Sequence, residues 1–109
     1  MDNRKKLFGI RISEVEINSE GFYHGEGKSW GIFDGNLRQE GQWSGGFWHG
    51  RWKTFDNNGN IEMVREYKKG KLTKIMVPEG GILREVPKGK WPKWSNRVQQ
   101  DKPVKAKLD

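Results

Sequence analysis

Residues 40–72 read EGQWSGGFWHGRWKTFDNNGNIEMVREYKKGKL, and this stretch decides the fold. Its aromatic residues are spaced as on β-strands, and its glycines stand where a backbone turns tightly or takes a positive φ. The clearest turn runs from Asp56 to Gly59, because an Asn-Gly pair tolerates the two left-handed conformations of a tight hairpin. The run that follows, 61–67, alternates apolar and acidic residues, as a strand with one buried face does. The stretch therefore predicts a β-hairpin.

The same pattern occurs earlier in the chain as an internal repeat. The sequence GFYHG at 21–25 matches GFWHG at 46–50, and the match continues at an offset of 25 residues that becomes 24 after the turn. A rival register aligns Glu20-Gly21 with Glu40-Gly41 at an offset of 20, and glycine is frequent enough for one of the two alignments to arise by chance. A degenerate third copy aligns 65–72 with 84–91. The repetition predicts a meander of antiparallel hairpins.

The repeated positions are an aromatic residue, a glycine, a His-Gly pair, two further aromatic residues and a turn glycine. In this order they are Trp43, Gly46, His49-Gly50, Trp52, Phe55 and Gly59. The pattern resembles the MORN repeat, and the glutamate-containing strand after the turn looks most like the variant common in bacterial antitoxin-like proteins. The resemblance is good over 40–72, partial over 20–39 and faint over 79–91. It implies a fold more strongly than a function, because such repeats occur in proteins with unrelated roles.

The composition favours a thin fold. The 109 residues are enough for one domain with a modest core. Hydrophobic residues make up only 32% of the chain, whereas six tryptophans and fifteen glycines are unusually many. Burial by a few large, flat side chains suits a single-layer sheet better than a thick two-layer core. We therefore expect an all-β fold in which a meander of antiparallel β-hairpins forms a single curved, twisted sheet.

We expect a single β-repeat domain over residues 1–95 and a disordered basic tail over 96–109, where the sequence is polar and lacks periodicity. Pro87 cannot donate a hydrogen bond to a strand ladder, so the last hairpin is expected at a sheet edge. In chain order, the domain comprises an N-terminal bent strand or two short strands (7–17), a partial repeat (20–39), the best repeat (40–72) and a degenerate capping hairpin (79–94).

Several function classes are disfavoured. The chain has no cysteine, which excludes disulfides and thiolate zinc sites. It has no apolar run of membrane-spanning length and no signal-peptide pattern, so we expect a cytoplasmic protein. His24 and His49 occupy equivalent repeat positions without metal-ligand spacing, and a structural bond to the backbone beside the following glycine is favoured over a metal site. With no nucleophile beside a base and no phosphate loop, we expect no enzyme activity, no metal and no cofactor.

Positive charge is concentrated in the C-terminal part of the chain. The net charge is +7, and residues 1–64 carry eight Lys/Arg and nine Asp/Glu, whereas 65–109 carry thirteen and five. Cations beside stackable rings suit an anionic partner, although lysines on a terminal hairpin can also simply prevent aggregation of strand edges. Trp48 is the best candidate for an exposed ring, because adjacent residues on a strand point to opposite faces. The predicted partner-binding residues are Phe47, Trp48, Tyr67, Lys68, Lys69, Lys71, Arg84, Lys88, Lys90, Trp91, Lys93, Trp94 and Arg97.

These observations predict a non-catalytic binding protein. The leading hypothesis, which draws in part on the resemblance, is a small inhibitor, antitoxin or immunity-type module that docks on an anionic protein surface. One alternative is nucleic acid or a phosphorylated nucleotide, held by the basic C-terminal hairpin with Trp91 and Trp94 stacking on bases. Another is attachment to an anionic membrane surface. Open sheet edges also allow an edge-to-edge homodimer.

Overall fold

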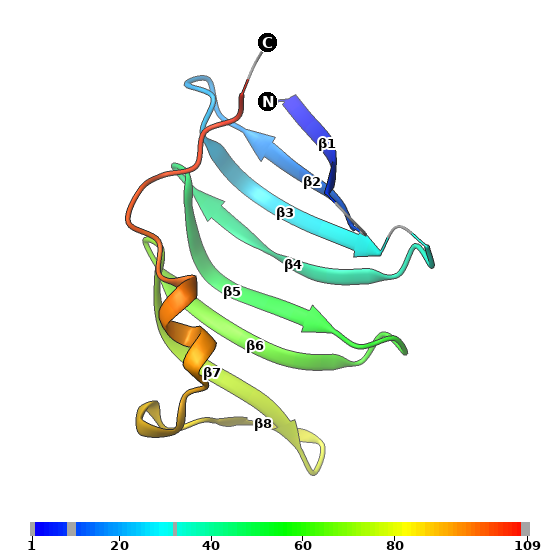
Figure 1. Cartoon of the computed structure of the whole chain (residues 1–109), viewed down its shortest axis with the longest axis vertical. Helices are drawn as coiled ribbons and strands as arrows, with labels where there is room; N and C mark the ends of the chain where they lie inside the picture. Colours follow the sequence, from blue (N-terminus) through cyan, green and yellow to red (C-terminus); the bar gives the residue numbers. More distant parts are fainter. Residues whose placement is uncertain (1, 9–10, 32, 108–109) are drawn as a thin grey trace.

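The computed structural model describes residues 2–8, 11–31 and 33–107, and for 2–8 and 11–12 it describes the strand pairing only. These residues form an all-β antiparallel meander of eight strands in one open, curved sheet, and the strands lie side by side in chain order (Figure 1). The strands are β1 (Asp2–Phe8), β2 (Arg11–Ile17), β3 (Tyr23–Gly31), β4 (Leu37–Ser44), β5 (Phe47–Phe55), β6 (Ile61–Lys68), β7 (Lys71–Glu79) and β8 (Ile82–Glu85). The predicted fold class is confirmed.

The N-terminal region contains two strands rather than one bent strand. β1 and β2 pair in antiparallel register from Asp2↔Ile17 to Phe8↔Arg11. The predicted stretch 7–17 therefore covers the end of β1 and all of β2, and residues 9–10 between them lie outside the described part of the chain.

The loop between β5 and β6 lies where the sequence predicts a turn, but its conformation differs from the expected one. The Asp56 carboxylate accepts hydrogen bonds from the N–H groups of Asn58 (2.9 Å) and Asn60 (3.0 Å), and within this loop only Gly59 takes a positive φ, of 84°. A left-handed pair occurs instead between β6 and β7, at Lys69-Gly70, with φ of 48° and 81°. Because the Asp56 side chain holds the wider loop together, a tight two-residue turn is not needed there.

The capping hairpin predicted over 79–94 is only partly correct. Gly80-Gly81, with φ of 60° and 82°, forms the turn between β7 and β8, and β8 lies at the sheet edge as expected. The strand ends at Glu85, however, and two short 3₁₀ helices follow, η1 (Lys88–Lys90) and η2 (Lys93–Val98). Pro87 and Pro92 stand immediately before these helices. Proline cannot donate to a strand ladder, so pairing does not continue through this region.

The C-terminal segment, residues 99–107, lies against the sheet, so the expectation of a disordered tail is wrong for the described part of 96–109. After η2 the chain runs along the edge of the sheet that the hairpin turns form at the strand ends, past the β6–β7, β4–β5 and β2–β3 turns (Figure 1). Its backbone N–H groups donate to turn carbonyl oxygens, in the pairs Gln100 to Gly70 (2.8 Å), Val104 to Gly46 (2.7 Å) and Ala106 to Gly21 (2.8 Å). A polar segment without periodicity is therefore held in place, because hairpin turns supply it with backbone hydrogen bonds.

Equivalent hydrogen bonds join successive turns at this edge. The Gly46 N–H donates to the Tyr23 carbonyl oxygen (2.7 Å), and the Gly70 N–H donates to the Trp48 carbonyl oxygen (2.8 Å). These pairs of residues correspond at offsets of 24 and 25, as in the first alignment of the repeat. The geometry thus favours that alignment over the rival register.

One face of the sheet, which we call the core face, carries the main hydrophobic cluster. Trp52, Tyr67, Leu72 and Ile75 are buried there, and side chains that follow β8, including Trp94, pack against them. Neighbouring rings meet at centroid distances of 5.6 Å for Trp43–Trp52 and 5.1 Å for Trp48–Tyr67, within the range of favourable aromatic contacts. A Cβ atom at Gly41 would lie 2.2 Å from the Trp52 ring. Glycine on β4 therefore leaves the space that the indole fills.

Candidate functional site

The predicted aromatic binding residues belong to the core face or its edge. Tyr67 is only 4% exposed, and Trp48, Trp91 and Trp94 are half-buried against the main cluster. Phe47 is half-buried next to Gly70. The expectation of rings presented freely on the repeat face is therefore wrong for Tyr67, and the other four rings are only partly exposed. The reason is that the chain beyond β8 folds back onto this face.

The predicted cations are all exposed and lie toward the β8 end of the sheet. Three of them come from the β6–β7 turn and the strand ends beside it, and the others come from β8, η1 and η2, which Figure 1 shows in the lower part of the molecule. Lys71 pairs with Asp101 (2.7 Å), and Arg84 pairs with Glu79 (3.1 Å). The other six have no ion pair with a described residue, and we call them the basic surface: Lys68, Lys69, Lys88, Lys90, Lys93 and Arg97.

A hollow of about 530 Å³ opens beside the basic surface, between β7 and the two 3₁₀ helices. Leu72 and Trp91 contribute apolar lining, and Lys88 and Lys93 contribute cations. The Lys88 ammonium lies 5.8 Å from the centre of the Trp91 ring, at the distance of a cation–π contact. The hollow thus combines apolar lining with positive charge and with the polar side chains of Ser95, Asn96 and Gln99.

Charges on the opposite face of the sheet are balanced by their neighbours. Glu14, Lys28, Glu40 and Lys53 are successive cross-strand partners from β2 to β5, so the sign of the charge alternates along this row. Lys28 also forms an ion pair with Glu26 (2.8 Å), and this hydrogen bond, with charge attraction from Glu26, raises the pKa of Lys28. The cations of the basic surface, which have no ion pair with a described residue, contrast with this arrangement.

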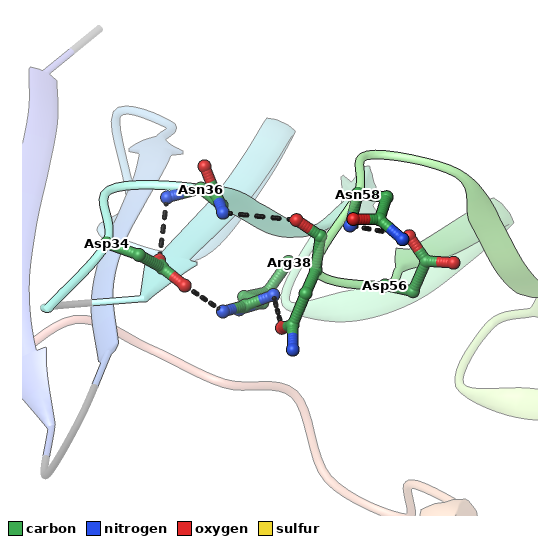
Figure 2. Close-up of polar contacts among 6 residues, drawn as sticks. Asp34, Asn36, Arg38, Asp56 and Asn58 are labelled. Atoms are coloured by element: carbon green, nitrogen blue, oxygen red, sulfur yellow. Dashed lines mark hydrogen bonds and ion pairs between the residues drawn. The ribbon is translucent and has the colours of Figure 1, made fainter.

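An open groove of about 620 Å³ lies between β4, β5 and β6 on one side and η2 on the other. Its apolar lining comes from Phe55, Met63 and Trp94. At its rim the Arg38 guanidinium donates to the carboxylate of Asp34 and to Oδ1 of Asn57 (2.7 Å), which ties the β3–β4 loop to the β5–β6 loop (Figure 2). The charge of Arg38 is thereby neutralised within its own loop region. We call this hollow the arginine groove.

Arg65, the second arginine of the groove, has no carboxylate partner among the described residues. Its Nη2 donates to Oε1 of Gln39 (3.2 Å), a neutral amide. The guanidinium carbon lies 5.6 Å from the centre of the Tyr67 ring and 5.9 Å from that of Trp94. Arg65 Nε and the Tyr67 hydroxyl are buried without a hydrogen-bond partner in the described part of the chain. Burial raises the pKa of Tyr67, and the charge of Arg65 opposes this shift.

The arginine groove was not predicted from the sequence, although the sequence contains one signal for it. Arg65 has the same strand parity as Met63 and Tyr67, which places a cation on the apolar face of β6. The other contributions were not predictable from local sequence. The contact of Arg38 with Asn57 joins β4 to the β5–β6 loop, and Trp94 reaches the groove only because η2 folds back over β6.

The histidines differ in their contacts. His24 Nδ1 accepts a hydrogen bond from the Gly45 N–H (3.0 Å) in the β4–β5 turn, and not from the backbone beside Gly25 as expected. Both histidines are exposed. Within the described residues, no group of three or more His, Cys, Asp or Glu is placed to hold a metal ion.

None of the described helices has the length and apolar character required to cross a membrane.

No family model, no curated protein and no solved structure matches this chain.

Proposed function

We propose that this protein is a non-catalytic binding module that docks on the anionic surface of a protein partner through its basic surface. The observation that carries the proposal is the contrast between the two kinds of charge on the sheet. Charges across β2–β5 alternate in sign, whereas the six cations of the basic surface have no ion pair in the described structure. An uncompensated patch of one sign attracts and orients an oppositely charged partner.

The hollow beside the basic surface supports a protein as the partner. Its apolar lining, Leu72 and Trp91, suits an apolar side chain of the partner, while Lys88 and Lys93 suit the carboxylates around it. The nucleic-acid alternative needs Trp91 and Trp94 to stack on bases. Both rings are half-buried against the core cluster, which leaves less of each ring for stacking and weakens that alternative.

The finer assignment, to an inhibitor, antitoxin or immunity-type module of MORN-like repeats, is part of the same proposal. It is supported by the equivalent hydrogen bonds of Gly46 and Gly70 one hairpin apart, and by the small size of the chain. In this proposal the repeats provide a rigid sheet, and the non-repeated C-terminal part provides the contact surface.

The test compares two charge-reversed proteins of equal net charge. One carries Lys90→Glu and Lys93→Glu in the basic surface, and the matched control carries Lys102→Glu and Lys107→Glu, which are also exposed. Each protein and the wild type are immobilised and exposed to host lysate with and without nuclease treatment, at low and at raised salt. We expect a defined protein species to be retained by the wild type and the control, released by salt, and lost with the first variant. Equal retention by both variants contradicts the proposal, and loss of all retention after nuclease treatment favours nucleic acid.

A further inference from the structure

We infer that the arginine groove is a separate binding site for a small organic carboxylate with an apolar body, and that Arg65 is the residue that pairs with the carboxylate. This site goes beyond the proposed function, because none of the six cations of the basic surface lines it. It requires no protein partner.

The charge of Arg65 is the first argument. A guanidinium that is half-buried among aromatic rings loses hydration, and this loss is normally offset by a carboxylate. Among the described residues the only hydrogen-bond acceptor that Arg65 meets is the neutral amide of Gln39, and its Nε is buried without any acceptor. Arg38, in the same groove, shows the usual arrangement, since Asp34 neutralises it. Arg65 is therefore the one of the two arginines whose charge has no carboxylate partner in the described structure.

The lining of the groove defines the rest of the ligand. Phe55, Met63 and Trp94 offer apolar and aromatic surface next to the guanidinium. Thr54 also lines the groove, and its hydroxyl donates a hydrogen bond to the Met63 carbonyl oxygen (Oγ1 to O, 3.4 Å). A volume of about 620 Å³ in an open groove accommodates a molecule of the size of an aromatic acid.

Two acids on the rim argue for a monoanion and against a phosphate. Asp56 and Glu62 both line the groove. The Asp56 carboxylate is engaged by backbone N–H groups of its own loop, and its negative charge remains at the rim. A doubly charged phosphate would be repelled more strongly by these groups than a single planar carboxylate, which also matches the fork of a guanidinium.

The experiment follows the Nε–Hε signal of Arg65 by NMR in the whole chain while 3-phenylpropionate is added. The neutral amide of this acid, inorganic phosphate and sodium chloride serve as matched probes. We expect a saturable shift with the acid only. In Arg65→Lys we expect the affinity for the acid, read from the tryptophan ring signals, to fall by at least about tenfold. Arg51→Lys is the control, because Arg51 is an exposed arginine of the opposite face that already pairs with Glu66 (3.3 Å).

Each outcome decides the inference. A shift that does not saturate, that the amide reproduces, or that follows sodium chloride overturns the site. A saturable response to phosphate of equal strength overturns the assignment to a carboxylate. Unchanged affinity in Arg65→Lys overturns the role of that residue. Because the measurement uses the isolated protein and a variant outside the basic surface, failure here is distinct from failure of the lysate test.

Discussion

Gly46 offers a direct test of whether the C-terminal segment is part of the folded domain. This residue has φ of 91°, and an added Cβ would lie 2.5 Å from Cβ of Pro103 and 2.9 Å from the backbone nitrogen of Val104. Gly59 has almost the same φ, 84°, but nothing lies within 4 Å of its Cβ position. Gly59→Ala therefore measures the conformational cost alone, about 1–2 kcal/mol. Gly46→Ala should cost about 1–3 kcal/mol more, because the C-terminal segment is displaced or strained.

The assay is urea denaturation of both variants, followed by tryptophan fluorescence, with the unfolding free energies compared at equal slope. A second measurement uses chains ending at Val98, where the excess cost of Gly46→Ala should disappear because Pro103 and Val104 are absent. The reasoning is refuted if the two substitutions differ by less than about 0.5 kcal/mol in the full chain, which is the usual size of an uninvolved surface change. It is also refuted if the excess persists in the shortened chain.

Two further predictions concern the core face. Burial raises the pKa of Tyr67 above its ordinary value of 10.0, so the folded state keeps this proton when the unfolded chain begins to lose it. This stabilisation of the folded state is fully present below pH 10 and is lost as the pH rises through the folded-state pKa of Tyr67, so urea melts at alkaline pH should show a smaller loss of unfolding free energy in Tyr67→Phe than in wild type. At neutral pH we expect the unfolding free energy of Tyr67→Phe to be at most about 1 kcal/mol below that of wild type, or higher than it, because the Tyr67 hydroxyl has no partner in the described structure. Gly41→Ala should destabilise by about 2–3 kcal/mol because its Cβ would overlap the Trp52 ring, whereas Gly89→Ala, with nothing within 4 Å, should change little; equal melts for the two alanine variants would contradict this account of the packing.

The strands of this protein were predictable because their signals are local. Alternation and glycine punctuation identify the hairpin of β5 and β6 within the stretch 40–72, and the internal repeat extends the meander to β3 and β4. The conformation of individual turns was less predictable, because a side chain can replace backbone geometry. Asp56 does so in the β5–β6 loop, while Lys69-Gly70 supplies the left-handed pair one turn later.

The path of the C-terminal residues was not predictable from their own sequence. Gln100 shows why: its side chain accepts from the Trp48 N–H (2.9 Å) and donates to the Gly46 carbonyl oxygen (2.5 Å). These partners lie more than fifty residues away, and they become available only when hairpins place their turns along one edge. A polar segment with such partners has the same composition as a disordered one, so composition alone cannot separate the two.

The arginine groove arises from a difference between the two repeats. The cross-strand pair Gly27↔Gly41 of the first hairpin corresponds, at offsets of 25 and 24, to the pair Trp52↔Arg65 of the second. In the first hairpin the two glycines leave space into which the indole of Trp52 packs. In the second, the position equivalent to Gly41 holds Arg65, and Trp94 of the non-repeated η2 covers it. The repeat thus determines where the backbone lies, and its divergence at this pair, together with η2, determines which side chains are available for binding.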